Sequence, residues 1–194
     1  MDILILDNIT EYDNKTNILT DVFLRSVQRL NPELTELQAK QLLNEIILIL
    51  NNNDLGREFY NKLSSNSNIK LIDFQNANRN EWHVTTEFEC ENQDSGDCFR
   101  PDITCFVNGL PLAFIEVKKP NNHDGILAER ERINRRMRNE KFRRFLNVTQ
   151  LMIFSNNQEY DNETEFRFKV HSIAVHQRTK LSSTSFVKPI KIFL

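Results

Sequence analysis

The sequence has little of what marks a secreted, membrane-bound or loop-rich protein. It holds four Gly and five Pro among 194 residues, which argues against a low-complexity chain. No stretch approaches the roughly 20 apolar residues of a membrane-spanning helix. The N-terminus lacks the basic segment and the long apolar run of a signal peptide. We therefore expect a cytoplasmic protein with no membrane partner.

Cysteine and histidine are also scarce. Cys90, Cys98 and Cys105 are odd in number, and their spacing matches neither a Cys-x-x-Cys pair nor a zinc site. We expect reduced thiols. The histidines show no ligand spacing either, so we expect them on the surface or in packing, with His123 alone close to the motif described below. They are His83, His123, His171 and His176.

What is present is the composition of a soluble globular domain, 39% hydrophobic and 27% charged. Fourteen Phe against one Trp and three Tyr predict a core filled with Phe. The length fits one domain. We expect a single domain over residues 1–194, with a helical lead-in at 1–66 and an α/β core at 67–194.

The net charge of −2 gives no indication of a nucleic-acid partner, but its distribution is uneven. From Glu129 to Arg144, eight Arg or Lys stand against three Glu, so this window carries +5 and the rest of the chain −7. A solvated helix face is the usual interpretation of such a run. We assign this basic run a role in binding nucleic acid only if an active site lies nearby.

The first third of the chain is predicted to be helical. Apolar residues recur at helical spacing from about residue 17 to 50. Asn31-Pro32 divides this stretch because the residue before a proline disfavours the helical region. A second helix is expected from Thr35, a suitable N-cap, to Leu50, and a short third helix from Leu55 to Leu63.

From residue 70 onward the pattern is that of strands. The β-rich runs are IKLIDF (69–74), HVTTEFEC (83–90), FRPDITCFV (99–107) and LAFIEVKK (112–119). Asn108-Gly109 is a strong turn signal between the last two. A charged helix is expected from about Gly125 to Phe145, followed by strands at 148–155 and 165–175. This order predicts an α/β or α+β layered domain.

One hairpin carries residues suited to chemistry. Asp102 begins one strand, and Glu116 and Lys118 lie two apart on the next, so their side chains project from the same face. The surrounding residues are apolar, and charged groups there are costly to bury unless they are paired or bind a metal. An ordinary ion pair on a half-buried hairpin is the competing interpretation.

Two converging carboxylates suit Mg²⁺, which takes oxygen ligands and keeps several waters. We assign Asp102 and Glu116 to the metal, with the Val117 carbonyl as a further ligand. Lys118 would orient the attacking water and stabilise charge on a phosphate. We expect Mn²⁺ to be able to substitute for Mg²⁺.

This arrangement depends on strand register. A regular two-residue turn at Asn108-Gly109 would pair Asp102 with Ile115 and send Asp102 and Glu116 to opposite faces. We therefore predict either an odd-length loop or a β-bulge.

Residues 69–120 resemble the N-terminal nuclease region of the R (restriction) subunits of type I restriction-modification enzymes. The LIDF, RPDI, FVNGLPL and EVKKP segments carry the resemblance, and RLNPEL at 29–34 resembles the helical lead-in of that family. The resemblance covers roughly residues 19–157 and rests on several separated motifs in the same order.

The resemblance implies a restriction-endonuclease-like PD-(D/E)xK core, in which helices flank a central mixed sheet. Its motif maps onto Pro101-Asp102 and Glu116-Val117-Lys118. The implied enzyme is a type I site-specific deoxyribonuclease that cuts double-stranded DNA non-specifically after ATP-driven translocation, together with modification and specificity subunits. ATP would act only through a motor region. Because the chain contains no GxxxxGK[ST] loop, we expect it to be the N-terminal part of a longer polypeptide.

The sequence departs from the family pattern in one place. Many members carry Q-x-x-x-Y on the helix after the ExK strand, whereas AERERINRRMRNEKF has neither residue. Basic residues near one helix face are our candidates for positioning DNA through its phosphates. They are Arg132, Arg135, Arg136 and Arg143. An acidic residue from an N-terminal helix often joins such a site, and the candidates are Asp21, Glu33, Glu36 and Glu45.

Two flanking residues have open assignments. Arg100 is placed either on phosphate or in an ion pair with a neighbouring Glu. Asp73 is expected to stabilise a turn or a helix N-terminus. Two other functions compete with the nuclease: a catalytically silent docking or DNA-binding domain of the same fold, and a stand-alone PD-(D/E)xK repair nuclease. The intact Asp-Glu-Lys triad favours an enzyme, and the restriction-type flanking motifs weigh against the repair nuclease.

Overall fold

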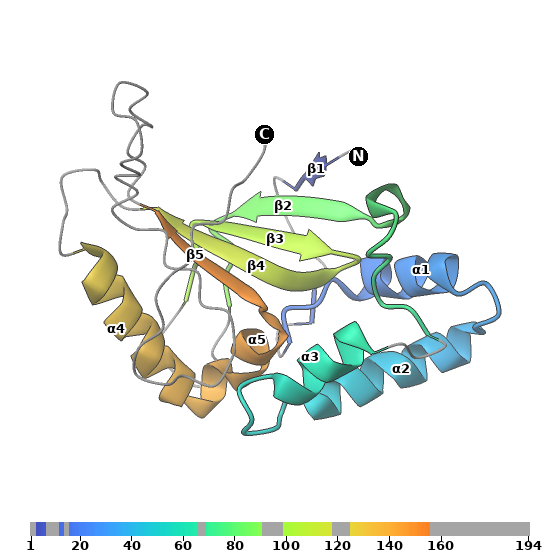
Figure 1. Cartoon of the computed structure of the whole chain (residues 1–194), viewed down its shortest axis with the longest axis horizontal. Coiled ribbons are helices and arrows are strands. Elements are labelled where there is room, and N and C mark those ends of the chain that lie inside the picture. The colour runs from blue at the N-terminus through green and yellow to red at the C-terminus, as the bar shows by residue number, and fades with distance from the viewer. Residues whose placement is uncertain are drawn as a thin grey trace.

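A five-stranded mixed sheet organises the protein, with helices packed against it (Figure 1). The computed structural model describes residues 3–6, 12–13, 16–65, 69–90, 99–117 and 125–155. The strands lie side by side in chain order: β1 (Ile3–Ile5), β2 (Trp82–Thr86), β3 (Ile103–Val107), β4 (Leu110–Val117) and β5 (Leu151–Ser155). The outer pairs, β1–β2 and β4–β5, are parallel, and the inner pairs are antiparallel. The expected mixed sheet with flanking helices is confirmed.

The N-terminal helices follow the predicted divisions. They are α1 (Thr20–Leu30), α2 (Glu36–Ile49) and α3 (Arg57–Ser64). Thr35 caps α2 as expected: its hydroxyl accepts a hydrogen bond from Gln38 N at 3.3 Å, and Gln38 Oε1 accepts one from Thr35 N at 2.9 Å. This reciprocal capping box satisfies two backbone donors that a helix start otherwise leaves unpaired.

Two strand predictions were inaccurate. Residues 69–74 form bends instead of a strand, because Asp73 Oδ1 accepts hydrogen bonds from Gln75 N and Asn76 N and so closes a turn. Asp73 therefore has the turn-stabilising role that we considered. Strand β1 was not predicted at all. The proposed strand at 165–175 lies outside the described residues.

The charged segment is also divided differently from the prediction. In place of one helix from 125 to 145, α4 spans Gly125–Arg138, a 3-10 helix (η2) spans Glu140–Phe142, and α5 spans Arg143–Val148. The side chain of Asn139 accepts a hydrogen bond from Lys141 N at 3.1 Å. This local cap starts a new element where the continuous helix was expected to run on.

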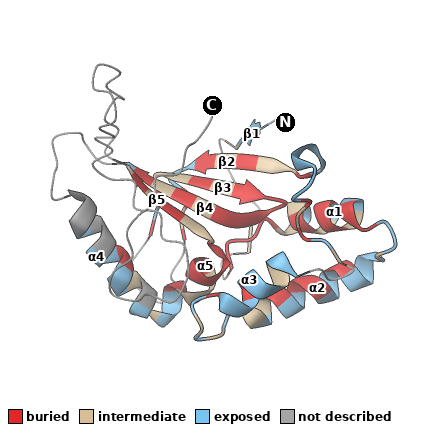
Figure 2. Cartoon of the chain, in the orientation of Figure 1, coloured by how far each residue is buried: buried red, intermediate tan, exposed pale blue. Residues whose placement is uncertain are grey.

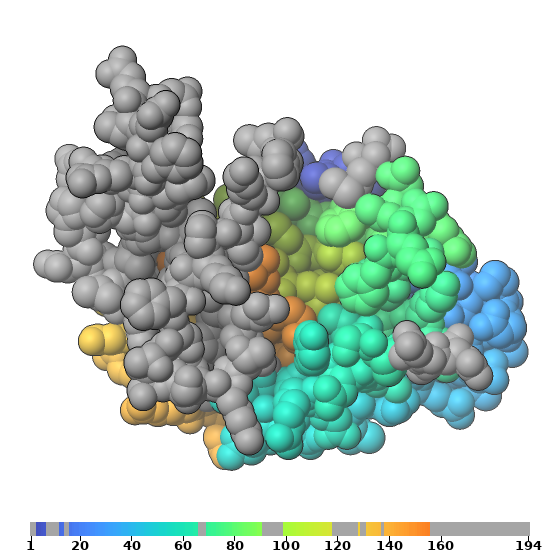
Figure 3. All heavy atoms as spheres, viewed as in Figure 1, coloured from blue at the N-terminus to red at the C-terminus, as the bar shows by residue number. Residues whose placement is uncertain are grey.

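Buried residues lie along the sheet and on the helix faces packed against it (Figure 2), and they are rich in Phe, as predicted. One cluster joins α1, α2 and α3 to the turn end of the β3–β4 hairpin. In Figure 3, α3 and the segment leading to β2 lie side by side at this end of the sheet. A second cluster lies beneath α4 and α5 and contains seven Phe: Phe88, Phe99, Phe106, Phe114, Phe142, Phe145 and Phe154. No helix in the described part of the chain is long and apolar enough to cross a membrane.

Asn108 fastens the hairpin turn to the preceding segment. Its Nδ2 donates to Leu71 O at 2.8 Å and to Asn80 Oδ1 at 3.0 Å, while its Oδ1 accepts from Glu81 N at 2.8 Å. Asn80 in turn accepts a hydrogen bond from Asp73 N at 2.9 Å. Buried amides that satisfy one another in this way hold a loop in a single conformation.

A polar cluster ties α1 to β2. Glu81, just before β2, accepts hydrogen bonds from Arg25 and from the Ser26 hydroxyl. The Arg25 hydrogen bond holds the pKa of the Glu81 carboxyl below its ordinary value. Glu81 also lies 3.3 Å from Nε2 of His83, whose pKa is lowered mainly by burial. His83 thus has the packing role expected for it.

Gly109, in the same turn, occupies a position where a side chain would both strain the backbone and collide with α1. Its φ is +78°, in the left-handed region that favours glycine. A Cβ at this position would lie 2.6 Å from Leu19 O and 2.7 Å from Phe23 N, because the turn is pressed against the start of α1. Leu19 N also donates to Gly109 O at 2.9 Å.

We therefore predict that Gly109→Ala lowers the free energy of unfolding by about 2–4 kcal/mol, through backbone strain and collision with α1. Urea denaturation followed by circular dichroism measures the change. Gly56, whose φ is +76°, provides the matched control. Gly56→Ala should cost only about 1 kcal/mol, the penalty of the left-handed backbone alone. Equal costs at the two positions would show that the contact with α1 is unimportant.

Candidate active site

Strand register brings the two proposed catalytic carboxylates together. Near the turn, Val107 pairs with Leu110 and Phe106 with Pro111. The register then shifts, so that Cys105 pairs with Ala113 and Leu112 is the extra residue. The pairing continues to Ile103 and Ile115, and one more step sets Asp102 opposite Glu116. Of our two alternatives, the β-bulge is confirmed, with the two-residue turn retained.

Asp102 closes the open end of the hairpin. Its Oδ2 accepts a hydrogen bond from Val117 N at 2.5 Å, and its carbonyl accepts one from Glu87 N at 3.2 Å. Asp102 is half-buried. The carboxylate is therefore anchored to the peptide that joins Glu116 to Val117, which fixes its position relative to the neighbouring strand.

Glu116 is buried, with only 5% of its surface exposed. It shares a sheet face with Phe114 on its own strand and pairs in parallel register with Phe154 of β5. Phe114 packs edge-on against Phe154 and is stacked on Phe145 of α5. A carboxylate amid such aromatic rings is costly to leave without strong partners. The position of Glu116 is therefore consistent with a site that binds a cation or a hydrogen-bond donor.

The remaining members of the proposed site lie at the edge of the described structure. Val117 is 39% exposed at the end of β4, so its carbonyl stands where the strand meets solvent. Lys118 and His123 lie outside the described residues. The donors present here, Asp102 and Glu116, are oxygen ligands only, and this set fits Mg²⁺ or Mn²⁺ better than a softer metal.

The expected acidic residue from an N-terminal helix is not found at the site. Within the described ranges, no three His, Cys, Asp or Glu side chains are grouped so as to hold a metal ion. Glu36 pairs with Lys40, and Glu45 with Lys62, both on the surface of α2. Asp21 and Glu33 are exposed. Helix α1 packs at the turn end of the hairpin, whereas Asp102 and Glu116 lie at its open end.

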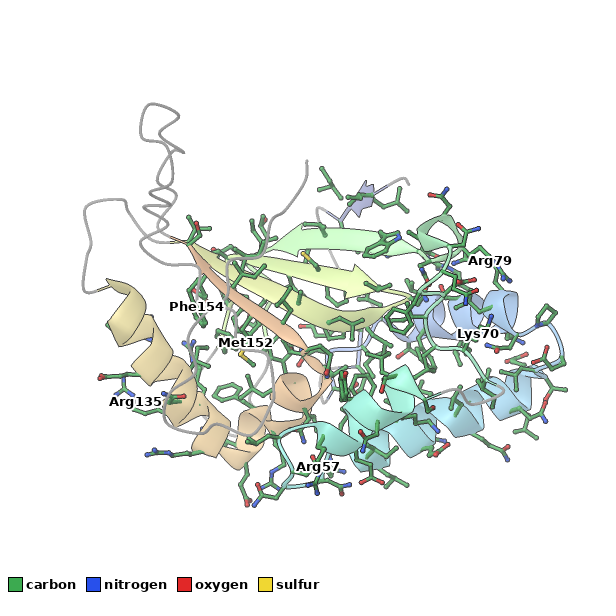
Figure 4. The ribbon with its side chains drawn as sticks, viewed as in Figure 1. Arg57, Lys70, Arg79, Arg135, Met152 and Phe154 are labelled. Atoms are coloured by element: carbon green, nitrogen blue, oxygen red, sulfur yellow. The ribbon has the colours of Figure 1, made fainter. Side chains whose placement is uncertain are left out.

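The four candidate DNA-binding arginines do not share one helix face, because α4 ends at Arg138. Arg132 and Arg135 are exposed on α4, and Figure 4 shows Arg135 toward the end of this helix that leads to α5. The guanidinium of Arg136 lies over the ring of Phe99, 4.0 Å from its centroid. Arg143 belongs to α5, where it pairs with Glu140 and donates to Asn51 O at 3.3 Å.

The segment before the motif is held by an ion pair. Arg100 Nη2 lies 2.9 Å from Glu89 Oε2, so the second of our two assignments for Arg100 is the one observed. Cys90 and Cys105 are free thiols, as expected, and burial raises the pKa of Cys105. Cys98 lies outside the described residues.

Sequence reasoning did not single out Thr104. This residue is completely buried and lies two positions after Asp102, on the same face of β3. The alternation of strand side chains in PDITCF contained the signal, since it places residues 102, 104 and 106 on one face.

The chain is similar in sequence to known restriction proteins. The family described as type I restriction enzyme R protein N terminus matches residues 5–164. Among curated relatives, all from Methanocaldococcus jannaschii, the MjaIXP endonuclease subunit of a type I restriction enzyme is 35% identical over 122 residues, 55% of this chain. The MjaVIIP endonuclease subunit is 37% identical over 87 residues, 45% of this chain.

The MjaVIIIP endonuclease subunit is 29% identical over 120 residues, 60% of this chain. The chain covers only 12%, 8% and 10% of the lengths of these three relatives, in the order given. The family match, by contrast, spans most of the chain and includes both strands of the hairpin. The chain therefore belongs to the family of type I restriction enzyme R protein N-terminal regions.

Proposed function

We propose that this chain is the metal-dependent endodeoxyribonuclease domain of a type I restriction enzyme R subunit, with a PD-(D/E)xK active site. The single observation that carries the proposal is the bulged hairpin. It sets Asp102 opposite Glu116 and anchors the Asp102 carboxylate to Val117 N. A regular hairpin of the same sequence would separate the two acids across the sheet, so the bulge is what makes a joint site possible.

Asp102, Glu116 and the Val117 carbonyl would hold Mg²⁺. When bound, the cation would neutralise charge on a DNA phosphate and favour ionisation of a water molecule. Asp102 keeps its position through Val117 N, and Glu116 keeps its position through the packing of β4 on β5. Preorganisation of this kind lowers the cost of assembling the reacting groups.

Lys118 would orient the attacking water and stabilise the phosphate, because continued strand alternation after Val117 would bring it to the face of Glu116. The water oxygen forms a bond to phosphorus as the bond from phosphorus to the leaving sugar oxygen breaks. One product end carries the phosphate and the other a hydroxyl. No residue of the chain becomes covalently attached.

DNA would approach along α4. Arg132 and Arg135 are the best-supported of the four arginines because both are exposed on α4, whereas Arg136 is half-buried over Phe99 and Arg143 belongs to α5. Contacts of this kind recognise phosphates and not base sequence. Target selection would therefore belong to specificity and modification subunits. Because the chain covers about a tenth of its relatives' length, ATP-driven translocation is assigned to the rest of such a polypeptide.

The metal assignment predicts the outcome of a calorimetric titration with Mn²⁺. Asp102→Asn and Glu116→Gln should each weaken binding by about a hundredfold or abolish it, because each removes a negatively charged oxygen ligand without changing the side chain's size. Glu36→Gln provides the matched control: it loses the same charge on the surface of α2 and should bind as wild type does. Lys118→Met should bind Mn²⁺ but fail to cut DNA.

A titration in the presence of a short duplex completes this test. If wild type binds Mn²⁺ only with duplex, the phosphate supplies missing ligands and the proposal stands. If wild type binds no Mn²⁺ in either case, the chain is a silent docking or DNA-binding domain, and the nuclease assignment fails.

The DNA interface predicts a change in salt dependence. The Arg132→Ala, Arg135→Ala double variant should lower the slope of log K against log salt for duplex binding by about 2, since each phosphate contact contributes about 0.9. Fluorescence anisotropy at several salt concentrations measures the slope. Arg57→Ala on α3, distant from Arg135 in Figure 4, is the control and should leave the slope unchanged. An unchanged slope in the double variant would remove α4 from the interface.

A further inference from the structure

A buried hydroxyl lies one row of side chains from the two carboxylates, on the same face of the sheet, and no hydrogen bond within the described structure explains its presence there. Thr104 is 0% exposed, and its Oγ1 has no hydrogen-bond partner among the described residues. A buried hydroxyl that makes no hydrogen bond destabilises the fold, whereas valine has nearly the same shape and carries no such cost. The presence of threonine at this point of the core therefore needs a reason.

The position of Thr104 on the sheet gives a reason for a hydroxyl at this point. Two successive rows of side chains cross this face of the sheet. The first row is Thr85, Thr104, Phe114 and Met152, one residue from each of β2 to β5. The second row contains Asp102, Glu116 and Phe154. Met152 and Phe154, labelled in Figure 4, mark the β5 ends of the two rows. Thr104 thus lies immediately behind the carboxylates, on their own face.

Glu116 is the carboxylate that this hydroxyl can serve best. It is diagonal to Thr104 across β3 and β4, a separation that long side chains can span. Asp102 is the more exposed of the two acids, whereas Glu116 is buried, as Thr104 is. A single water between Thr104 Oγ1 and Glu116 would satisfy the hydroxyl and direct one carboxylate oxygen, as buried waters do between polar groups.

The neighbouring polar side chains of Thr85 and His83 are less well placed to orient Glu116. The hydroxyl of Thr85, in the same row, donates to Leu6 O at 2.9 Å. His83 Nδ1 is the other buried atom without a partner in the described part of the chain, but His83 pairs with Phe106, one row farther from the carboxylates. Its Nε2 lies 3.3 Å from Glu81, on the side of α1.

We propose that Thr104 is a positioning residue: its hydroxyl, through one buried water, orients the Glu116 carboxylate. The consequence for metal binding rests on the proposed function, whereas the link between Thr104 and Glu116 does not. Residues that hydrogen-bond to a metal ligand fix the orientation of that ligand, and removing them commonly changes the affinity of the site for the metal. Thr104 would act on the reaction only through Glu116 and would not touch DNA.

A double-mutant cycle tests the link without a metal. Thr104→Val, Glu116→Gln and the double variant are unfolded in urea, and their effects are compared for additivity. We expect Thr104→Val to destabilise the wild type more than it destabilises the Glu116→Gln variant, with a coupling of about threefold or more in the folding equilibrium constant. Thr104→Ser should restore wild-type behaviour. Additive effects, or a Thr104→Val variant more stable than wild type, would overturn the proposal.

Thr85→Val is the matched control. It removes a buried hydroxyl from the same row, but one that is bonded to Leu6 O, so it should lower stability additively with Glu116→Gln. A cycle in which Thr85 couples to Glu116 as strongly as Thr104 does would mean that the coupling is a general response of the sheet, and the assignment to Thr104 would fail.

Calorimetry with Mn²⁺ then separates this proposal from the proposed function. Thr104→Val should weaken Mn²⁺ binding about tenfold, and Thr85→Val should leave it unchanged. Coupling without any Mn²⁺ binding by wild type, whether or not duplex is present, would uphold the link and reject the metal site. Wild-type Mn²⁺ affinity in Thr104→Val, together with additive stabilities, would leave the metal site intact and reject the role of Thr104.

Discussion

The extra residue in β4 is the constraint on which the candidate site depends. Leu112 has no partner across the hairpin, and this one-residue excess changes the parity of every pair between the bulge and the open end. The same hairpin therefore keeps a tight Asn108-Gly109 turn and still sets Asp102 opposite Glu116. A bulge also increases the local twist of the strands. The turn end can then pack against α1 while the open end presents its acids elsewhere.

Much of this arrangement could be predicted because it is local in sequence. Thr35 and Gln38 are three residues apart, and Asn108-Gly109 is a contiguous turn signal, so the rules of capping and turn formation apply directly. A parity argument predicted either an odd-length loop or a bulge, since a regular two-residue hairpin would send Asp102 and Glu116 to opposite faces. The bulge is the alternative that the structure shows. The failures had a local cause and a distant one. Residues 69–74 alternate like a strand, but the Asp73 carboxylate closes a turn there and the distant Asn108 holds Leu71 O. Strand β1 pairs with residues almost eighty positions away.

The site combines charge with an apolar setting. Glu116 lies among Phe114, Phe154 and their neighbours, where the dielectric response is weak and every electrostatic interaction is strengthened. The basic residues of α4 lie outside this aromatic layer, and Arg136 meets it directly through Phe99. Phe residues thus serve two purposes in this fold: they fill the core beneath α4 and α5, and they form the surroundings in which the carboxylate must find its partners.

The contact between Gly109 and the start of α1 has a consequence for the order of folding. A two-residue hairpin can close within microseconds, since its strands are adjacent in the chain. The hydrogen bond from Leu19 N to Gly109 O joins residues about 90 positions apart and requires a long loop to close first. The pairing of Asp102 with Glu116 is therefore encoded within a segment of some fifteen residues, and docking onto the helices secures a register that this short segment already specifies.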